Sequence, residues 1–281
     1  MALVELDAVL GCLAVEQTGP ATWTAPNIEM DYRRIFGGQL LAQAIALGAA
    51  TSDGKTVRSV TCLFPREGSL DEALEFEVEE TQTGRAFATR RISAAQNGKT
   101  FFVAQLSMHD SSEASPHDHH DAMPDVGSPD DAAPDESTMI PWDNRVVGGV
   151  DLADRGTADA DFAFWSRISD RDLPDDLTTH QALAAYATDL NVIATLLRPI
   201  DGVSVADAHV TLHTAVTSHS LSFHRPFRMD DWCLIGQHGV SLSGARGYGT
   251  GTVHTIDGTL AASFTQESMI RPLPPAPPNA S

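Results

Sequence analysis

The sequence predicts an α+β fold made of two similar halves, each with one helix followed by an antiparallel sheet. Three observations predict it. A mostly apolar stretch precedes alternating segments on both sides of an acidic tract. The turn signals come in the same order in both halves, and the last predicted strand of each half ends in a similar sequence. A chain of 281 residues is long enough for two such units with a real hydrophobic core.

The elements follow in order along each half. The first half has an apolar helical stretch at 35–50, and the second half has one at 180–197. Alternating segments that we expect to form antiparallel strands come next, at 57–64, 74–98 and 99–109 in the first half and at 213–224, 232–258 and 259–270 in the second.

The turns between these segments support the repeat. Asn97-Gly98 in the first half matches Asp257-Gly258 in the second, and both dipeptides are strong signals for two-residue hairpins. The last predicted strands of the two halves end in similar four-residue segments, QLSM and QESM, which align Gln105 with Gln266. Such an order of matches is hard to obtain by chance.

Both helical stretches are apolar nearly all round rather than on one stripe. A helix of this kind must be covered on most of its surface. A long helix wrapped by its own curved antiparallel sheet meets that need, and this arrangement is the hotdog fold. The sequence therefore predicts a double hotdog, with two repeats in one chain.

A domain division follows from composition. We expect an N-terminal hotdog repeat at 1–109, an acidic flexible linker at 110–140, a C-terminal repeat at 141–271 and a Pro-rich disordered tail at 272–281. The linker is rich in acids and prolines and lacks Lys and Arg, so it cannot bury enough apolar surface to repay ordering. The linker contains His117, His119 and His120, which could be interpreted as a metal site. A solvated tract is the better interpretation, because nothing holds these side chains in a fixed geometry.

The net charge excludes some partners. The chain has 18 Lys and Arg against 38 Asp and Glu, a net charge of −20, which disfavours nucleic acid and anionic membranes. Nine of those acids belong to the linker, so nearly half of the net charge lies outside the folded halves. The arginines of the halves can still bind phosphate groups locally, so a small polyanionic ligand is allowed.

The remaining composition points to the cytoplasm. The chain has three cysteines, Cys12, Cys62 and Cys233, which are far apart and not in a CxxC pair. Their number and spacing argue against a disulfide framework or a zinc site and suit a reducing compartment. The N-terminus lacks the basic region of a signal peptide, and no run approaches the roughly 18 apolar residues of a membrane span. We expect a cytoplasmic protein.

Asp189 is the exception within the second helical stretch. On a continuous helix it shares a face with Ala182, Ala185, Val192 and Leu196. A carboxylate on such a face is costly unless it is paired or hydrogen-bonded. It either bonds a nearby backbone amide or hydroxyl, or it is a general base with a pKa shifted by burial. Both interpretations stay open at this point.

Several segments resemble the acyl-CoA thioesterase II family of the TesB type, in the right order along both halves. They are RRIFGGQLLAQA (33–44), ATRRISAAQNGK (88–99), LPDDLTTHQALAAYATDLNVIATLL (173–197), HSLSFHRPFRMDDWCL (219–234) and LAASFTQESMIRP (260–272). The resemblance implies a double hotdog that hydrolyses acyl-CoA to a fatty acid and free CoA. It also implies that no metal or organic cofactor is needed, and it suggests a homo-oligomer.

The resemblance also implies the site. Asp189 matches the family's catalytic aspartate and Gln266 its catalytic glutamine. This pairing makes physical sense, because one group can deprotonate the attacking water while an amide orients it. Backbone N–H groups at a helix start would suit the carbonyl oxygen of the substrate. Taken alone, Gln266 would read as an ordinary strand glutamine.

One position departs from the family pattern. Where the family has a Thr or Ser, this chain has Val216, and strand alternation puts Thr214 and Ser218 on the same face but Thr217 on the other. A bulge could bring Thr217 in, although the sequence does not show one. The alternative function is therefore a weakly active or non-catalytic acyl-CoA-binding hotdog protein. A hotdog enoyl-CoA hydratase is disfavoured, because no His lies a turn beyond Asp189.

Overall fold

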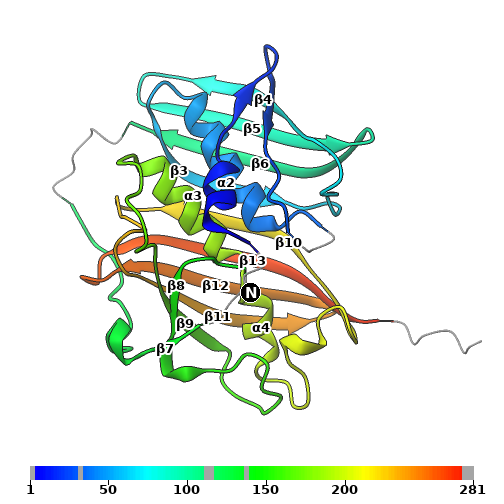
Figure 1. The fold of residues 1–281 in the computed structure, drawn as a ribbon, viewed down its shortest axis with the longest axis vertical. Helices are drawn as coiled ribbons and strands as arrows, with labels where there is room; N and C mark the ends of the chain where they lie inside the picture. Colours follow the sequence, from blue (N-terminus) through cyan, green and yellow to red (C-terminus); the bar gives the residue numbers. More distant parts are fainter. Residues whose placement is uncertain (1–3, 31–33, 111–116, 136–138, 274–281) are drawn as a thin grey trace, which may run out of the picture.

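The computed structural model describes residues 4–30, 34–110, 117–135 and 139–273, which form one antiparallel sheet of thirteen strands. The long strands run across the view of Figure 1, with β4, β5 and β6 in its upper part and β13, β12 and β11 in its lower part, and α2 and α3 lie between these two groups. The strand order is β1-β2-β4-β5-β6-β3-β10-β13-β12-β11-β9-β8-β7. Each half of the chain therefore supplies one continuous half of the sheet.

The N-terminal half has two helices and six strands among its described residues. They are α1 (Leu6–Gly11), β1 (Glu16–Gln17), β2 (Thr22–Ala25), α2 (Gly37–Ala50), β3 (Thr56–Leu63), β4 (Leu74–Thr83), β5 (Phe87–Gln96) and β6 (Lys99–His109). The hairpin between β5 and β6 turns at Asn97-Gly98, where both residues have positive φ, as the dipeptide predicts.

The C-terminal half repeats the arrangement with additions at its start. Its elements are the 3₁₀ turn η1 (Pro129–Asp131), β7 (Ala133–Pro134), β8 (Asp143–Val146), η2 (Val147–Gly149), β9 (Asp161–Arg167), α3 (Leu177–Thr188), α4 (Val192–Leu197), η3 (Val205–Asp207), β10 (Leu212–Phe223), β11 (Cys233–Ser243), β12 (Arg246–Thr255) and β13 (Leu260–Pro272).

The two halves meet along one strand pair and one helix pair. Strands β3 and β10 pair antiparallel from Leu63↔Ser218 to Ser59↔Ser222, which joins the two half-sheets. Helices α2 and α3 pack against each other, and a Cβ on Gly38 would lie 2.5 Å from the carbonyl oxygen of Tyr186. Because glycine has no Cβ, the backbones of α2 and α3 approach each other at Gly38 more closely than any larger residue would permit. The double hotdog prediction is confirmed.

The second predicted helix is not continuous, which corrects the expectation for 180–197. Helix α3 ends at Thr188, and α4 begins only at Val192. Asn191 between them has φ 71°, a left-handed conformation that Asn tolerates better than most residues. The chain therefore changes direction directly after Asp189, and the helical face inferred for Asp189 does not extend to Val192 or Leu196.

Part of the expected linker has regular structure. Residues 129–131 form η1, and Ala133 and Pro134 pair with Val146 and Arg145 of β8. Residues 111–116 and 136–138 of that segment lie outside the described residues, as do residues 274–281 of the expected tail. The start of that tail, Pro272, is the last residue of β13. Domain boundaries near 110, 140 and 272 remain a proposal.

Two kinds of feature are absent from the described residues. No helix among them is long and apolar enough to cross a membrane. Within the same residues, no group of three or more His, Cys, Asp or Glu side chains is placed to hold a metal ion.

Candidate active site

The break between α3 and α4 places Asp189 at the end of α3, facing the start of α2. Asp189 is the C-cap of α3 and is 6% exposed. Asn191, at the break, accepts hydrogen bonds at its carbonyl from Thr195 N at 2.8 Å and Thr195 Oγ1 at 2.9 Å. These bonds fix the turn, so the position of Asp189 is set by the backbone on both sides.

Helix α2 begins directly against the Asp189 carboxylate. The Gly38 backbone N–H donates a hydrogen bond to that carboxylate, and a Cβ on Gly37 would lie 2.7 Å from Asp189 Oδ2. The N-cap residue, Phe36, offers no side-chain acceptor to the first N–H groups of the helix. The site is therefore composite, because the carboxylate comes from the C-terminal half and the helix start from the N-terminal half.

Burial leaves Asp189 with an unusual acidity. Its pKa rises from 3.8 to about 7, because burial penalises the charged form more than the Gly38 N–H favours it. Asp189 Oδ1 is buried and has no hydrogen-bond partner among the described residues. A carboxylate that titrates near neutrality and has one unpaired oxygen is suited to accept a proton from a substrate or a water.

Gln266 is on the same side of the sheet, and His219 connects it to Asp189. Gln266 is 1% exposed and pairs directly with His219 across β13 and β10. His219 Nδ1 lies 3.1 Å from Gln266 Oε1 and 4.0 Å from Asp189 Oδ1. The structure thus places both residues named by the resemblance around one imidazole nitrogen.

The sequence reasoning missed His219. It is the first residue of the family-like segment at 219–234, but nothing in the sequence pattern singles it out. It is fully buried, and burial lowers its pKa from 6.5 to about 4, so the ring is neutral near pH 7. The signal that could have found it is its place in β10, since it lies on the face that carries the inward-facing residues.

The hydroxyl expected near Val216 is not where the family pattern puts it. Strand β10 has a bulge between Val216 and Ser218, which the sequence did not reveal. The bulge does not bring Thr217 into the site, because its Oγ1 donates to the Glu267 carbonyl at 3.2 Å. It also moves Ser218 to the other face, where its hydroxyl lies 3.5 Å from the Glu267 carboxylate. Thr214 and Val216 line the cavity beside Asp189.

The bulges correct the alignment of the two halves. Strand β3 has a matching bulge between Val57 and Ser59. Counted from these bulges, His219 and Gln266 correspond to Val60 and Leu106, a pair in the same register. Gln105, which the sequence comparison aligned with Gln266, is one position away and exposed. The N-terminal half therefore has an apolar pair where the C-terminal half has the polar one.

The matching end of α2 is occupied by a buried arginine. Thr51, the C-cap of α2, accepts a hydrogen bond at Oγ1 from Arg90 Nε at 3.2 Å, and Arg90 is 1% exposed. Its guanidinium also donates to the Gln82 carbonyl at 2.9 Å. Arg90 thus satisfies the end of α2 with a buried cation, whereas the end of α3 carries the buried carboxyl of Asp189.

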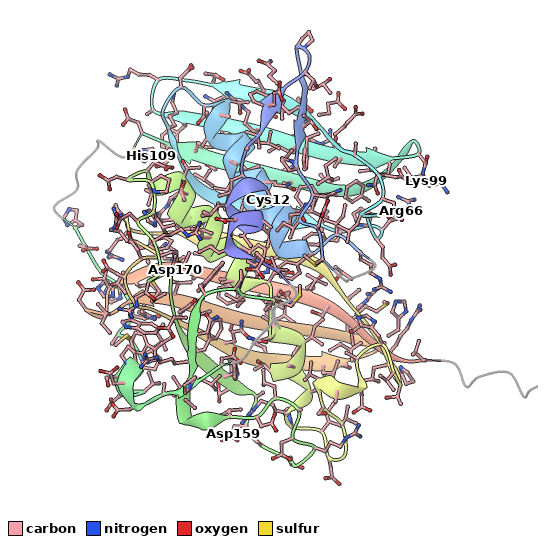
Figure 2. The ribbon with its side chains drawn as sticks, viewed as in Figure 1. Cys12, Arg66, Lys99, His109, Asp159 and Asp170 are labelled. Carbon is pink, nitrogen blue, oxygen red and sulfur yellow. The ribbon has the colours of Figure 1, made fainter. Side chains whose placement is uncertain are left out.

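Asp189 lies on the wall of a cavity of about 260 Å³ between the halves. Most of its lining is apolar and includes Ile35, Leu40, Phe64 and Ile193. Its polar residues include two arginines and an acid, namely Arg34, Arg66 and Glu67. Arg34 Nε forms an ion pair with Glu67 at 2.9 Å. The one hydrogen bond described for the Arg66 guanidinium goes to the Thr100 carbonyl, at 2.8 Å. Figure 2 labels Arg66 near the edge of the molecule.

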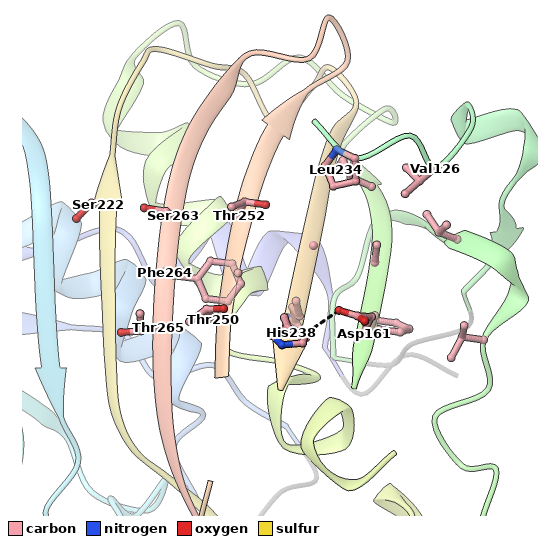
Figure 3. Close-up of a pocket in the computed structure, with 18 of the residues that line it drawn as sticks. Val126, Asp161, Ser222, Leu234, His238, Thr250, Thr252, Ser263, Phe264 and Thr265 are labelled. Atoms are coloured by element: carbon pink, nitrogen blue, oxygen red, sulfur yellow. Dashed lines mark hydrogen bonds and ion pairs between the residues drawn. The ribbon is translucent and has the colours of Figure 1, made fainter. Parts of the chain in front are cut away.

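A second and larger cavity, of about 740 Å³, lies on the other face of the C-terminal half-sheet. Figure 3 shows Ser222, Ser263 and Thr252 on neighbouring strands there. Asp161 Oδ1 and His238 Nδ1 lie 2.7 Å apart on its wall, on the adjacent strands β9 and β11. Asp189 lines the smaller cavity and not this one, and Gln266 lines neither. The smaller cavity is therefore the candidate active site, because it holds the perturbed carboxylate.

Both halves of the chain match domains of known proteins. Residues 26–109 match the acyl-CoA thioesterase N-terminal domain, and residues 113–270 match the acyl-CoA thioesterase C-terminal domain. The chain is 29% identical to acyl-coenzyme A thioesterase 8 of Rattus norvegicus over 267 residues, which cover 86% of this chain and 82% of the relative.

Two solved structures are similar over almost their whole length. One is an acyl-CoA thioesterase II, TesB2, from Mycobacterium marinum, with 30% identity, a TM-score of 0.80, and coverage of 94% of this chain and 98% of that one. The other is a tesB protein from Mycobacterium avium subsp. paratuberculosis, with 25% identity, a TM-score of 0.80, and coverage of 95% of this chain and all of that one.

Proposed function

Because the chain belongs to the acyl-CoA thioesterase II family of the TesB type and is a thioester hydrolase, we propose that it cleaves fatty acyl-CoA with a water molecule activated by Asp189 and oriented by Gln266. One observation carries the proposal. Asp189 Oδ1 is buried and unpaired within the described residues, in a cavity that the start of α2 also borders.

The chemistry begins with the water. A water held between Asp189 Oδ1 and Gln266 Oε1 donates one hydrogen to each oxygen and directs a lone pair at the thioester carbon. Gln266 Oε1 can accept this bond in addition to the one from His219, because a carbonyl oxygen has two acceptor sites. As the water attacks, its proton passes to Asp189, whose pKa of about 7 suits a base at neutral pH.

The start of α2 would stabilise the intermediate. Negative charge develops on the former carbonyl oxygen, and the first N–H groups of a helix have no partners within the helix. The Gly37 N–H borders the cavity and is the donor that we assign to this oxygen. When the intermediate collapses, the carbon–sulfur bond breaks, and the CoA thiolate takes the proton back from Asp189. The products are the fatty acid and free CoA.

The test of this function is release of free thiol from acyl-CoAs of several chain lengths. We expect steady turnover and release of one thiol for each fatty acid formed. Tight binding of acyl-CoA with no thiol release would contradict catalysis and would favour the alternative, an acyl-CoA-binding hotdog protein with Val216 in place of a hydroxyl. The chain-length series also reports how much acyl chain the cavity of about 260 Å³ accepts.

The pH dependence of the reaction should follow Asp189. Its raised pKa of about 7 means that the base form is lost as pH falls below 7. We expect kcat/KM to fall by about tenfold per pH unit below that value and to level off above it. His219, with its pKa lowered to about 4, should add no inflection between pH 5 and pH 9. A profile that stays flat down to pH 5 would contradict Asp189 as the base.

We also propose that Arg66 contacts a phosphate of CoA. It lines the cavity, and its guanidinium has no carboxylate partner among the described ion pairs, unlike that of Arg34. An Arg66→Ala change should raise KM for acyl-CoA by about tenfold, which is the loss of one hydrogen bond to a charged group, and leave kcat nearly unchanged.

A matched substrate and a matched variant control this prediction. The KM of an acyl-pantetheine, which lacks the phosphates, should not change with Arg66→Ala. Arg91→Ala should leave both KM values as in the wild type, because Arg91 is exposed, pairs with Glu79 and does not line the cavity. An equal rise in KM for both substrates with Arg66→Ala would show that Arg66 acts on packing rather than on phosphate.

Two further expectations belong with this function. The three cysteines are buried and free, which is consistent with our proposal of a cytoplasmic location. A homo-oligomer stays a prediction, and sedimentation of the purified chain would test it.

A further inference from the structure

Gln266 is held at both ends of its amide group, and neither partner was assigned a role by the proposed mechanism. Its Oε1 accepts a hydrogen bond from His219 Nδ1 at 3.1 Å, and its Nε2 donates to Ser268 Oγ at 3.2 Å. All three side chains are essentially buried, at 1%, 0% and 0% exposure. Solvent therefore does not compete for these bonds.

The hydrogen-bond roles follow from the chemistry of the groups. A carbonyl oxygen can only accept, so His219 must carry its proton on Nδ1. The depressed pKa of His219 keeps the ring neutral, which leaves Nε2 as an acceptor. Thr188 Oγ1 lies 3.3 Å from that nitrogen and 2.9 Å from the Ala185 carbonyl, so its single hydrogen can go to only one of them. The Gln266 oxygen is therefore the group that selects the tautomer of His219.

The imidazole is also fixed in orientation. It stacks on Phe264, with ring centroids 5.5 Å apart and planes inclined by 14°. Thr188 immediately precedes Asp189 at the end of α3, while Gln266 and Ser268 lie on β13. The imidazole thus lies between the end of α3 and strand β13, with Nδ1 bonded to Gln266 and 4.0 Å from Asp189 Oδ1.

Ser268 brings a hydroxyl close to the position where the family pattern lacks one. It is the direct cross-strand partner of Val216, and side chains of such partners lie on the same face of a sheet. Its hydroxyl accepts the hydrogen bond from Nε2 of Gln266. With the nitrogen fixed there, the oxygen of the amide stays next to His219.

We propose that His219 and Ser268 are positioning residues that hold the Gln266 amide with its oxygen toward the water site beside Asp189. The inference rests on the proposed function, since it takes Gln266 as the residue that orients the water. An amide that rotated by half a turn would present N–H groups to the water instead of an acceptor, and the attacking lone pair would lose its orientation.

The test is a set of variants measured by steady-state kinetics and thermal unfolding. His219→Phe keeps a stacked ring but removes both nitrogens, and it should lower kcat by about tenfold to a hundredfold with KM within about twofold. His219→Asn places an N–H near the former Nδ1 and should restore most of the lost kcat. Ser268→Ala should lower kcat by about tenfold. Thr265→Ala, on the outer face beside Gln266, is the matched control and should behave as the wild type.

A double-mutant cycle separates positioning from a general structural role. In a Gln266→Ala background, His219→Phe and Ser268→Ala should have no further effect on kcat, because their target is gone. If these changes lower kcat by the same factor with and without Gln266, the inference is wrong. If His219→Phe does not fold, wild-type kcat in Ser268→Ala would also overturn it.

The same cycle tells this failure apart from failure of the proposed function. Wild-type kcat in Gln266→Ala alone would remove Gln266 from the mechanism, whatever the other variants do. A large loss in Gln266→Ala, together with no loss in His219→Phe and Ser268→Ala, would keep the mechanism and reject only the positioning role.

Discussion

Replacing Asp189 with asparagine is expected to lower kcat for acyl-CoA hydrolysis by about 10²- to 10⁴-fold, the usual range for loss of a positioned general base. Asparagine keeps the size of the side chain and an oxygen for the Gly38 N–H, but it cannot take a proton from water. KM should change little. The measurement is thiol release at saturating acyl-CoA, and a rate close to that of the wild type would reject Asp189 as the base.

The same variant should be more stable than the wild type above neutral pH. The pKa of Asp189 rises on folding from 3.8 to about 7, so the folded state is favoured when the group is protonated. Its contribution to stability is complete below pH 3.8 and is lost as pH rises through 7. At about 1.4 kcal/mol per pKa unit, this loss is roughly 4 kcal/mol at pH 8, and Asp189→Asn should recover much of it.

The stability of both proteins can be compared by urea unfolding at several pH values. We expect the difference in free energy of unfolding to be largest at pH 8 and to shrink toward pH 4. Asp176→Asn is the matched control at the other end of α3, because asparagine caps a helix as well as aspartate does. Asp176→Asn should have the kcat of the wild type, and its free energy of unfolding should equal that of the wild type at every pH. A less stable Asp189→Asn protein at pH 8 would show that burial does not penalise this carboxylate.

Gly38→Ala is expected to damage both the packing and the activity. A Cβ at this position would lie 2.4 Å from the Phe36 ring and 2.5 Å from the Tyr186 carbonyl oxygen, and the second contact is with backbone that cannot rotate away. Helices α2 and α3 must then move apart, at a cost of about 1–3 kcal/mol. A displacement near 1 Å between α2 and Asp189 would lower kcat by about 100-fold.

Two other glycines provide the comparison. Gly37→Ala places a Cβ 2.7 Å from Asp189 Oδ2, so it should lower kcat with a smaller loss of stability, since the carboxylate can shift. Gly11→Ala, in α1, meets nothing within 4 Å and should leave both quantities unchanged. Unfolding midpoints and kcat measured for the three variants test this prediction. A Gly38→Ala protein as active and stable as the wild type would contradict the close approach of α2 and α3.

Local signals in the sequence predicted many elements correctly. The strand predicted at 99–109 is β6, the helix at 35–50 contains α2, and Asn97-Gly98 forms the expected hairpin. These successes depend on neighbouring residues, through alternation of apolar side chains and the positive φ that a tight turn requires. The helix predicted at 180–197 was wrong at its centre, because an apolar run shows no sign of the left-handed residue at Asn191.

The alignment of the halves failed for a related reason. The bulge in β3 lies opposite Ser107 and Met108 of QLSM, whereas the bulge in β10 lies opposite Glu267 and Ser268 of QESM. Similar residues of the two segments therefore lie on opposite faces. A shift of one residue in a strand exchanges its two faces, which is why Gln105 is exposed and Gln266 is buried. Bulges depend on how strands fit together, and the sequence of one strand does not display them.

The sequence by itself determined the repeat and the class of fold through periodicity and turn chemistry. Matching segments carried the resemblance to acyl-CoA thioesterases, which implies Asp189 and Gln266 as the site residues that we propose. The tertiary structure alone decided that the site is shared between the halves, that α2 begins against Asp189, and that His219 and Ser268 hold Gln266. The physical reason is distance along the chain. Burial, pKa and hydrogen bonds between residues far apart in sequence exist only once the sheet has brought them together.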